Sequence, residues 1–225
     1  MTENQSFPDH PLDWRGGVPV SGRFDDPFYS LEDGLAETRH VFLAGNGLPG
    51  RFRDGFSIAE LGFGTGLNFV AAVAAWAGAR IDGCLRFTSF EAYPLSPEDA
   101  RRALDAFPEA APHAPLVEAA LAGSGRASAG GVTLEIVRGD ARETVPRWTD
   151  MADAWFLDGF APARNPELWE EGLLSSVARH TAPGGTCATY SAAGAVRRAL
   201  AEAGFAVERV PGYGRKRHMT TGRLG

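Results

Sequence analysis

Carboxylate side chains stand near the ends of three apolar segments that have the character of buried strands. Glu60, Glu91 and Asp140 occupy these places. A carboxylate at a strand end can bind a nucleoside: Glu91 can accept from both ribose hydroxyls, and Asp140 from an adenine amino group. A solvated strand-end carboxylate is the structural alternative at each position. Three acidic residues at three successive strand ends favour a nucleotide pocket.

A glycine-rich segment, ELGFGTGLN (60–68), follows the first of these strands and opens a helix. Gly62, Gly64 and Gly66 let the backbone turn tightly and approach a ligand closely. The spacing is G-x-G-x-G, whereas a dinucleotide-binding loop carries its third glycine at the position of Leu67. Because this form binds no pyrophosphate, we expect the helix N-terminus to face a methionine carboxylate. The pattern predicts a pocket for S-adenosylmethionine.

The segment DGFAPARNP (158–166) follows the fourth predicted strand and is where we expect the chemistry. A primary amine must be neutral to attack a sulfonium methyl group, and Asp158 can orient its lone pair and take a proton. The ring of Phe160 can pack on an acceptor base or stabilise a cationic centre. A loop-capping Asp158 and a core Phe160 are the alternative, but a loop position favours function. In-line alignment should supply most of the remaining acceleration, and no metal is needed.

The elements that must position these residues alternate between strands and helices from residue 56 onward. Such alternation predicts a parallel α/β sheet of Rossmann-like type, which binds ligands at the carboxyl ends of its strands. The last two strands are joined by a short turn and must be antiparallel. We predict seven strands in a mostly parallel sheet with an antiparallel last strand. The predicted strands are 56–61, 84–91, 132–140, 152–160, 185–191, 205–210 and 217–224.

Residues 1–55 differ from the rest, since they are rich in glycine, proline, aspartate and aromatic residues. We interpret them as an N-terminal extension packed on a methyltransferase domain of residues 56–225. Within the extension, the apolar pattern of residues 31–43 predicts a short helix. Residues 123–131, GSGRASAGG, predict a flexible surface loop.

The composition suits one ordinary globular domain, with 225 residues, 44% hydrophobic and 22% charged. A formal net charge of -6 argues against general coating of nucleic acid but permits a local basic patch. Cys84 and Cys187 lie in apolar runs, and we expect them to be buried and without zinc. Because no apolar run reaches the ~18 residues of a membrane span and the N-terminus lacks signal-peptide features, we expect a cytoplasmic protein without membrane contact.

The segment GYGRKRH (212–218) is the one dense basic cluster. Arg215, Lys216 and Arg217 beside an aromatic residue suit phosphate contact and base stacking. Arg164 can add to the same face. A hairpin turn with solvated charge is the alternative. We expect modest, salt-sensitive binding of tRNA through a one-sided patch.

With these residues in place, the chain resembles the methyltransferase part of the MnmC family, the tRNA 5-methylaminomethyl-2-thiouridine biosynthesis enzymes. The run DAWFLDGFAPARNPELW is long and unusual, which makes the resemblance specific. The resemblance implies methylation of the aminomethyl nitrogen on the wobble uridine of tRNA. The similar stretches, which cover nearly the whole chain, are residues 25–43, 60–69, 89–95, 153–169, 183–200 and 204–219.

The resemblance also implies roles for individual residues. Asp158 and Phe160 are expected to face the substrate amine, and Tyr29 to close the pocket. Contacts to S-adenosylmethionine are implied for Tyr29, Glu60, Gly62, Gly64, Gly66, Asn68, Glu91, Asp140, Ala141 and Asp158.

Two departures from the family pattern change what we expect. Arg164 stands where the family motif usually has lysine, and the two are not equivalent at a phosphate or carboxylate. The chain also stops after the seventh predicted strand, where bifunctional members continue into a flavin-dependent oxidase that makes the amine. We therefore expect a standalone, MnmD-like enzyme or an excised domain that binds no FAD. The oxidase would be a separate protein or a C-terminal fusion.

Three other functions stay open. The acceptor could be a small-molecule or protein amine instead of tRNA. A nicotinamide-dependent oxidoreductase is a second alternative, although Leu67 and the lack of an obvious hydride-transfer set count against it. A non-catalytic RNA-binding module is a third, and the intact acidic residues at the strand ends count against that one.

Overall fold

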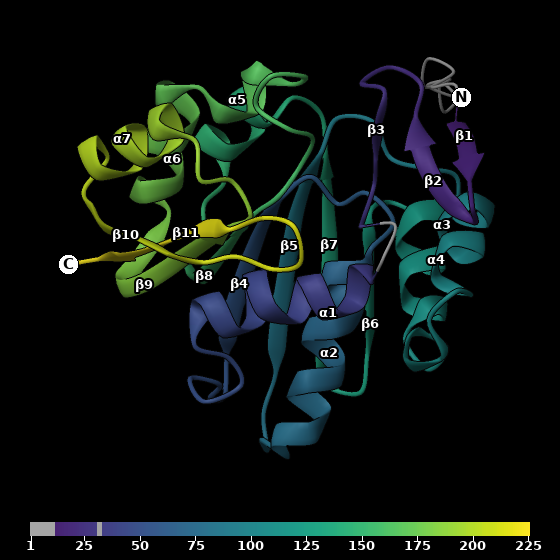
Figure 1. The fold of residues 1–225 in the computed structure, drawn as a ribbon. Helices are drawn as coiled ribbons and strands as arrows, with labels where there is room; N and C mark the ends of the chain where they lie inside the picture. Colours follow the sequence, from purple (N-terminus) through teal and green to yellow (C-terminus); the bar gives the residue numbers. More distant parts are fainter. Residues whose placement is uncertain (1–11, 31–32) are drawn as a thin grey trace, which may run out of the picture.

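The computed structural model describes residues 12–30 and 33–225, and its centre is an eight-stranded sheet (Figure 1). The strands of this sheet are Phe56–Leu61 (β4), Leu85–Glu91 (β5), Arg126–Ala129 (β6), Val132–Arg138 (β7), Ala152–Leu157 (β8), Thr181–Thr189 (β9), Phe205–Pro211 (β10) and His218–Leu224 (β11). Their order is β10-β11-β9-β8-β4-β5-β7-β6. From β9 to β7 neighbouring strands run parallel, whereas β11 is antiparallel to both of its neighbours.

The predicted α/β class and the antiparallel last strand are confirmed, but the sheet contains one strand more than the seven predicted. The extra strand, β6, lies in the segment that we predicted to be a flexible loop, and it pairs antiparallel with β7. Gly130 and Gly131 have φ angles of 55° and 80° and form the two-residue turn between them. A glycine pair between two short segments was the available sequence signal. The residues of β6 are small and mostly exposed, so they show no apolar pattern that would predict a strand.

Side chains of the central strands alternate between two apolar layers, one on each face of the sheet. Phe156 packs in the layer covered by α1 to α4, whereas its neighbours Trp155 and Leu157 pack in the layer covered by α5 to α7. The central strand β4 is buried along its whole length, which is why its sequence is an unbroken apolar run apart from Ser57 and Glu60. The helices are Gly34–Thr38 (α1), Leu67–Ala79 (α2), Pro97–Leu104 (α3), Ala114–Ala122 (α4), Ala141–Thr144 (α5), Glu171–Arg179 (α6) and Gly194–Glu202 (α7).

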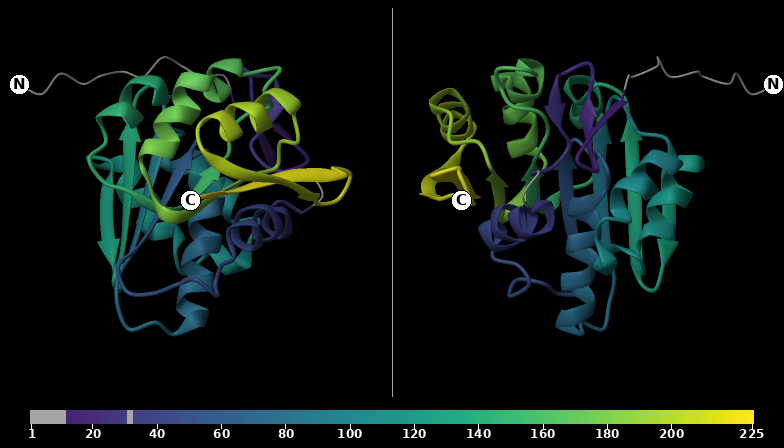
Figure 2. Two further views of the ribbon diagram at one scale, coloured as in Figure 1. Left: turned by 90° about the vertical axis from the view of Figure 1, so that its left-hand side faces the viewer. Right: turned by 45° about the vertical axis from the view of Figure 1, so that its right-hand side comes forward.

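The segment before β4 packs against the main sheet without joining it (Figures 1 and 2). It contains a three-stranded antiparallel sheet of Leu12–Arg15 (β1), Val18–Ser21 (β2) and Asp26–Pro27 (β3). Helix α1 continues as a π-helical turn, Arg39–Leu43, and a 3-10 turn, Ala44–Asn46. The helix predicted over 31–43 is thus confirmed from residue 34, and its first two residues lie outside the described ones. The division of the chain at residue 55 stays a prediction.

Two smaller expectations have different outcomes. Cys187 is buried as predicted, but Cys84 is exposed because β5 begins only at Leu85. Within the described residues, no helix has the length and apolar character needed to cross a membrane.

Arg51 ties the N-terminal segment to the main sheet. Its guanidinium donates to the carbonyl oxygens of Asn46 (2.8 Å) and Asp153 (2.9 Å) and to the hydroxyl of Thr186. Replacing Arg51 with Met leaves these partly buried acceptors without their donor. We expect the free energy of unfolding to fall by about 3 kcal/mol, as for the loss of buried hydrogen bonds to a charged group. Urea unfolding at pH 7 measures it.

Arg53→Met is the matched control, because the same residue type lies two positions away. Its side chain is 62% exposed and forms an ion pair with Asp153 at 2.7 Å. An exposed pair of this kind contributes at most about 1 kcal/mol. Equal losses in the two variants would show that Arg51 is not a structural tie.

Candidate active site

A cavity of about 760 Å³ lies at the carboxyl ends of β4, β5, β7 and β8, within the size range of small-molecule sites. The loops that follow these four strands meet there, together with the N-terminal segment and the β10–β11 turn. Most residues predicted for the site therefore come together. Those that line the cavity are Tyr29, Gly62, Gly64, Asn68, Glu91, Asp140, Ala141, Asp158, Phe160, Arg215 and Lys216.

The glycine-rich loop passes directly under the loop that follows β8. Gly62 has a φ angle of 79°, and a Cβ there would lie 3.2 Å from the Cα of Gly159. Gly64 has a φ angle of 54°, and a Cβ there would press on the ring of Phe28 at 3.2 Å. Both positions thus need glycine for conformation and for space. Gly66, with a φ angle of 82°, is the residue before helix α2 and packs against Val117 beneath the cavity wall.

Asn68 connects two carboxylates, Glu60 and Asp158. Its amide nitrogen donates to Glu60 Oε1 at 2.8 Å and to Asp158 Oδ2 at 2.7 Å. Its amide oxygen accepts from the hydroxyl of Thr38, in helix α1, at 2.9 Å. Both N–H groups and the oxygen of this buried amide are therefore used. The arrangement fixes Asp158 in the cavity wall.

Glu60 lies behind the cavity instead of lining it. Its side chain is fully buried, and its second oxygen accepts from the hydroxyl of Ser89 at 2.6 Å. Burial raises the pKa of this carboxyl well above its usual range, and the charge of Asp158 raises it further. Since Asn68 and Ser89 take both oxygens, the structure makes Glu60 a support for Asn68. Glu60 is not among the cavity-lining residues, and a direct cofactor contact from it stays a prediction.

Glu91 and Asp140 reach the cavity in different electrostatic states. Glu91 accepts from the backbone N–H groups of Gly64 (3.1 Å) and Tyr93 (2.7 Å), and burial raises its pKa. Asp140 caps helix α5 and forms an ion pair with Arg142 at 2.6 Å, which lowers its pKa. Glu91 thus braces the glycine loop, and Asp140 enters the cavity already paired with a cation.

Asp158 is the carboxylate whose pKa is best suited to proton transfer near neutral pH. Burial raises its pKa to about 6, against the hydrogen bonds from the Gly159 N–H and Asn68. The charge of Lys216 opposes this rise and that of Glu37 adds to it. A carboxyl group with this pKa is mostly ionised at pH 7 and can still hold a proton briefly.

Phe160 belongs to an aromatic cluster that the sequence did not reveal. Its ring stacks on Phe24, with centroids 4.6 Å apart, and meets the edge of Phe28 at 5.2 Å. Both partners come from the N-terminal segment and line the cavity. Phe28 directly precedes Tyr29, which the family resemblance placed at the pocket, whereas nothing in the sequence marked Phe24. Tyr29 lines the cavity and donates to the Ala103 carbonyl at 3.2 Å.

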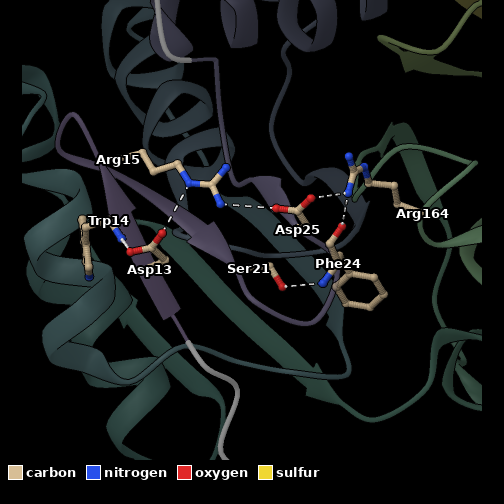
Figure 3. Close-up of polar contacts among 7 residues, drawn as sticks. All are labelled: Asp13, Trp14, Arg15, Ser21, Phe24, Asp25 and Arg164. Carbon is tan, nitrogen blue, oxygen red and sulfur yellow. Dashed lines mark hydrogen bonds and ion pairs between the residues drawn. The ribbon is translucent and has the colours of Figure 1, made fainter.

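Arg164 is paired inside the molecule. Figure 3 shows Asp25 between the guanidinium groups of Arg164 (3.0 Å) and Arg15 (3.3 Å). Arg164 also donates to the Phe24 carbonyl at 3.1 Å. These contacts hold the β2–β3 turn against the loop after β8, so Arg164 seats Phe24 over Phe160. Arg164 and Arg217 are not among the cavity-lining residues, and RNA contact from either stays a prediction.

Known proteins resemble this chain along most of its length. A family model described as S-adenosyl-L-methionine-dependent methyltransferase matches residues 111–224. The tRNA 5-methylaminomethyl-2-thiouridine biosynthesis bifunctional protein MnmC of Marinobacter nauticus is 46% identical over 95% of the chain and 36% of that protein. The protein of the same name in Pseudomonas paraeruginosa is 49% identical, over 94% of this chain and 34% of that protein. The chain thus spans about a third of the length of these curated relatives.

Solved structures share the fold. The crystal structure of MNMC2 from Aquifex aeolicus matches with a TM-score of 0.77 at 22% identity, over 99% of this chain and 72% of that one. Precorrin-6y C5,15-methyltransferase from Geobacter metallireducens matches with a TM-score of 0.52 at 15% identity, over 88% of this chain and 90% of that one. The predicted methyltransferase fold is therefore confirmed.

The contact between Asn68 and Asp158 can be tested by titration. Replacing Asn68 with Ala removes a hydrogen bond that stabilises the charged form of Asp158. We therefore expect the pKa of Asp158 to rise above its value of about 6 in the unaltered chain. Carbon NMR of labelled aspartate side chains measures the shift. Asn165→Ala, which removes another amide from the cavity wall, should leave this pKa unchanged. A constant or lower value in the Asn68 variant would contradict the assigned contact.

Proposed function

Since the chain belongs to the family of S-adenosyl-L-methionine-dependent methyltransferases, we propose that it methylates the aminomethyl nitrogen on the wobble uridine of tRNA. The observation that carries the acceptor chemistry is a partly buried carboxylate of raised pKa, Asp158, beside the aromatic cluster of Phe160 in a cavity at the strand ends. The name of the similar MnmC proteins, tRNA 5-methylaminomethyl-2-thiouridine biosynthesis bifunctional protein, supports the choice of tRNA. The family match sets aside a nicotinamide-dependent oxidoreductase.

The cavity residues fit the cofactor. The glycine loop leaves room next to the start of helix α2, whose N-terminal dipole favours a carboxylate. Glu91 lies at the end of β5, where it can accept from ribose hydroxyls. Asp140 and Ala141 line the wall near the end of β7, where we place the adenine. Bound S-adenosylmethionine supplies an electrophilic methyl group on its sulfonium.

Asp158 prepares the acceptor. At neutral pH a primary alkylamine arrives protonated, as the lysine side chain does. Asp158 accepts a hydrogen bond from this ammonium and takes one proton, which leaves the nitrogen lone pair free. The nitrogen then forms the N–C bond as the bond between methyl and sulfur breaks, so the positive charge moves from sulfur to nitrogen. Asn68 keeps the carboxylate aligned throughout, and alignment at about 3 Å supplies much of the acceleration.

Phe160 and Phe24 give the cavity an apolar face next to Asp158. A pyrimidine ring can stack on such a face, as unpaired RNA bases do on aromatic side chains. Arg215 and Lys216 lie at the cavity and Arg217 beside them on the same turn, where we propose that they meet RNA phosphates. We also propose that a flavin-dependent oxidase, separate or fused, makes the aminomethyl group.

The direct test of the function uses the chain with labelled S-adenosylmethionine and bulk tRNA from cells that lack this modification. We expect label in a methylaminomethyluridine nucleoside after digestion, identified by mass spectrometry. Label that appears only in a protein or small-molecule amine would move the substrate to another amine. The chain with Gly62 replaced by Val is the background control, because the added side chain would collide with Gly159.

Replacing Asp158 with Asn removes the proton acceptor and nearly preserves shape. We expect cofactor affinity to stay within a few-fold and turnover to fall by roughly a hundredfold, as for a lost general base. Because burial raises the pKa of Asp158 to about 6, the rate of the unaltered chain should fall as the pH drops through 6. Single-turnover rates of methyl transfer, measured at pH values on both sides of 6, test this fall.

The acidic limb near pH 6 should disappear in the Asp158→Asn variant. Asp150→Asn removes an exposed carboxylate before the same strand and should behave as the unaltered chain does. If Asp158→Asn turned over at a nearly normal rate, Asp158 would have no part in the mechanism.

A further inference from the structure

The ammonium group of Lys216 is bound by two side chains from distant parts of the chain. Its Nζ lies 2.8 Å from Glu37 Oε1 and 4.0 Å from the centroid of the Tyr190 ring. Glu37 belongs to α1, Tyr190 follows β9, and Lys216 lies in the turn between β10 and β11. All three line the same cavity as Asp158. The β10–β11 hairpin passes close to the helical segment of α1 and the π-helical turn after it (Figure 2), and His40 of that turn contacts the carbonyl of Pro211 at the end of β10 at 3.1 Å.

The two partners of Lys216 form a rigid site for a cation. Glu37 is only 14% exposed at its side chain. The Tyr190 hydroxyl donates to the Gly159 carbonyl at 2.7 Å, and Trp169 packs edge-on against the ring. Both contacts fix the face that Tyr190 presents to the cavity. An aromatic face beside a carboxylate attracts an alkylammonium ion by electrostatics.

The electric field around Tyr190 is negative. Burial raises the pKa of its phenol, and the charges of Asp158, Asp26 and Glu37 raise it further. Three carboxylates thus act on one ring, and Lys216 is a cation held directly on that ring. This field favours a positive charge at the acceptor end of the cavity.

The group that fills this site has the same chemistry as the acceptor of the proposed reaction. A lysine side chain and an aminomethyl group both end in a primary alkylammonium ion near neutral pH. We propose that Glu37 and the face of Tyr190 recognise the acceptor's ammonium group, and that Lys216 occupies this site until the acceptor displaces it. The inference deepens the proposed function and rests on it for the identity of the acceptor.

Displacement of Lys216 requires little free energy. Its side chain is 46% exposed, and ion pairs that remain partly solvated are weak. Arg215 and Arg217 flank it on the turn, so a polyanion that approaches this turn offers Lys216 a new partner. An ammonium in the vacated place lies within the field of Asp158, which then accepts its proton. RNA binding and opening of the amine site are coupled through one lysine.

The test compares Lys216→Met, Glu37→Gln and the unaltered full chain. The probe is the n-propylammonium ion, and n-propanol is its neutral counterpart. Binding is followed by NMR titration of the labelled Tyr190 ring. Because Lys216 no longer competes, we expect Lys216→Met to bind n-propylammonium up to about fivefold more tightly, the equivalent of one weak ion pair. Glu37→Gln should bind it roughly tenfold more weakly. Neither change should alter the weak response to n-propanol.

Arg209→Met is the matched control, since it removes an exposed positive charge from β10 without touching the cavity. It should bind n-propylammonium as the unaltered chain does. The proposal is overturned if Lys216→Met binds the ion no better than Arg209→Met, or if Glu37→Gln binds it equally well. Thermal unfolding of each variant identifies a loss of fold, and Glu37→Asp, which keeps the carboxylate, should restore much of the binding.

The outcome is separable from that of the proposed function. If n-propylammonium binds as expected but tRNA receives no methyl group, the ammonium site stands and the acceptor is another amine. If tRNA is methylated but the affinity for n-propylammonium is the same in the Glu37 and Lys216 variants as in the unaltered chain, the methyltransferase assignment stands and the proposed ammonium site is wrong. Repeating the titration with 5-aminomethyluridine and 5-hydroxymethyluridine then tests whether the uridine itself contributes.

Discussion

The side-chain amide of Asn68 holds three parts of the chain in one geometry. It donates to Glu60 on β4 and to Asp158 after β8, and it accepts from Thr38 in α1. Each hydrogen bond to a charged partner contributes about 1.5–3 kcal/mol, and an unmade one would leave a buried polar group unsatisfied. The orientation of the amide is thus fixed, and with it the direction in which Asp158 faces. The end of β4, Asp158 and the N-terminal segment are all connected through this single group.

The same contact explains why the N-terminal segment is part of the active site. Thr38 orients Asn68, Glu37 lies one residue away in the cavity wall, and Phe24 and Phe28 cover Phe160. Without this segment the cavity would open to water, and the burial that raises the pKa of Asp158 would be reduced. The sequence indicated a segment of different composition packed on the core. Its chemical contribution comes from contacts across more than 100 residues, such as that between Asp26 and Ala161.

The elements that the sequence predicted well are those whose signal is local. The strand ends that carry Glu91 and Asp140 lie at the cavity, as the apolar runs before these residues predicted. Parallel strands bring their carboxyl ends to one edge, so periodicity alone sufficed to gather these residues. Glu60 follows the same pattern, but its side chain meets Asn68 of helix α2 and does not line the cavity. The side-chain alternation of a strand fixes that direction only once the faces of the sheet are known.

Two cations have partners far away in the chain that the sequence could not show. Arg164 and Lys216 both suggested phosphate contacts, because basic residues near an aromatic one suit RNA, and those contacts stay predictions. In the fold Arg164 binds Asp25, 139 residues earlier, and Lys216 binds Glu37, 179 residues earlier. Net charge and local pattern contain no information about such pairs. The two contacts differ in position: Arg164 holds Phe24 over Phe160. Lys216 lies in the cavity, beside a carboxylate and an aromatic ring, in the place that we propose for the substrate ammonium.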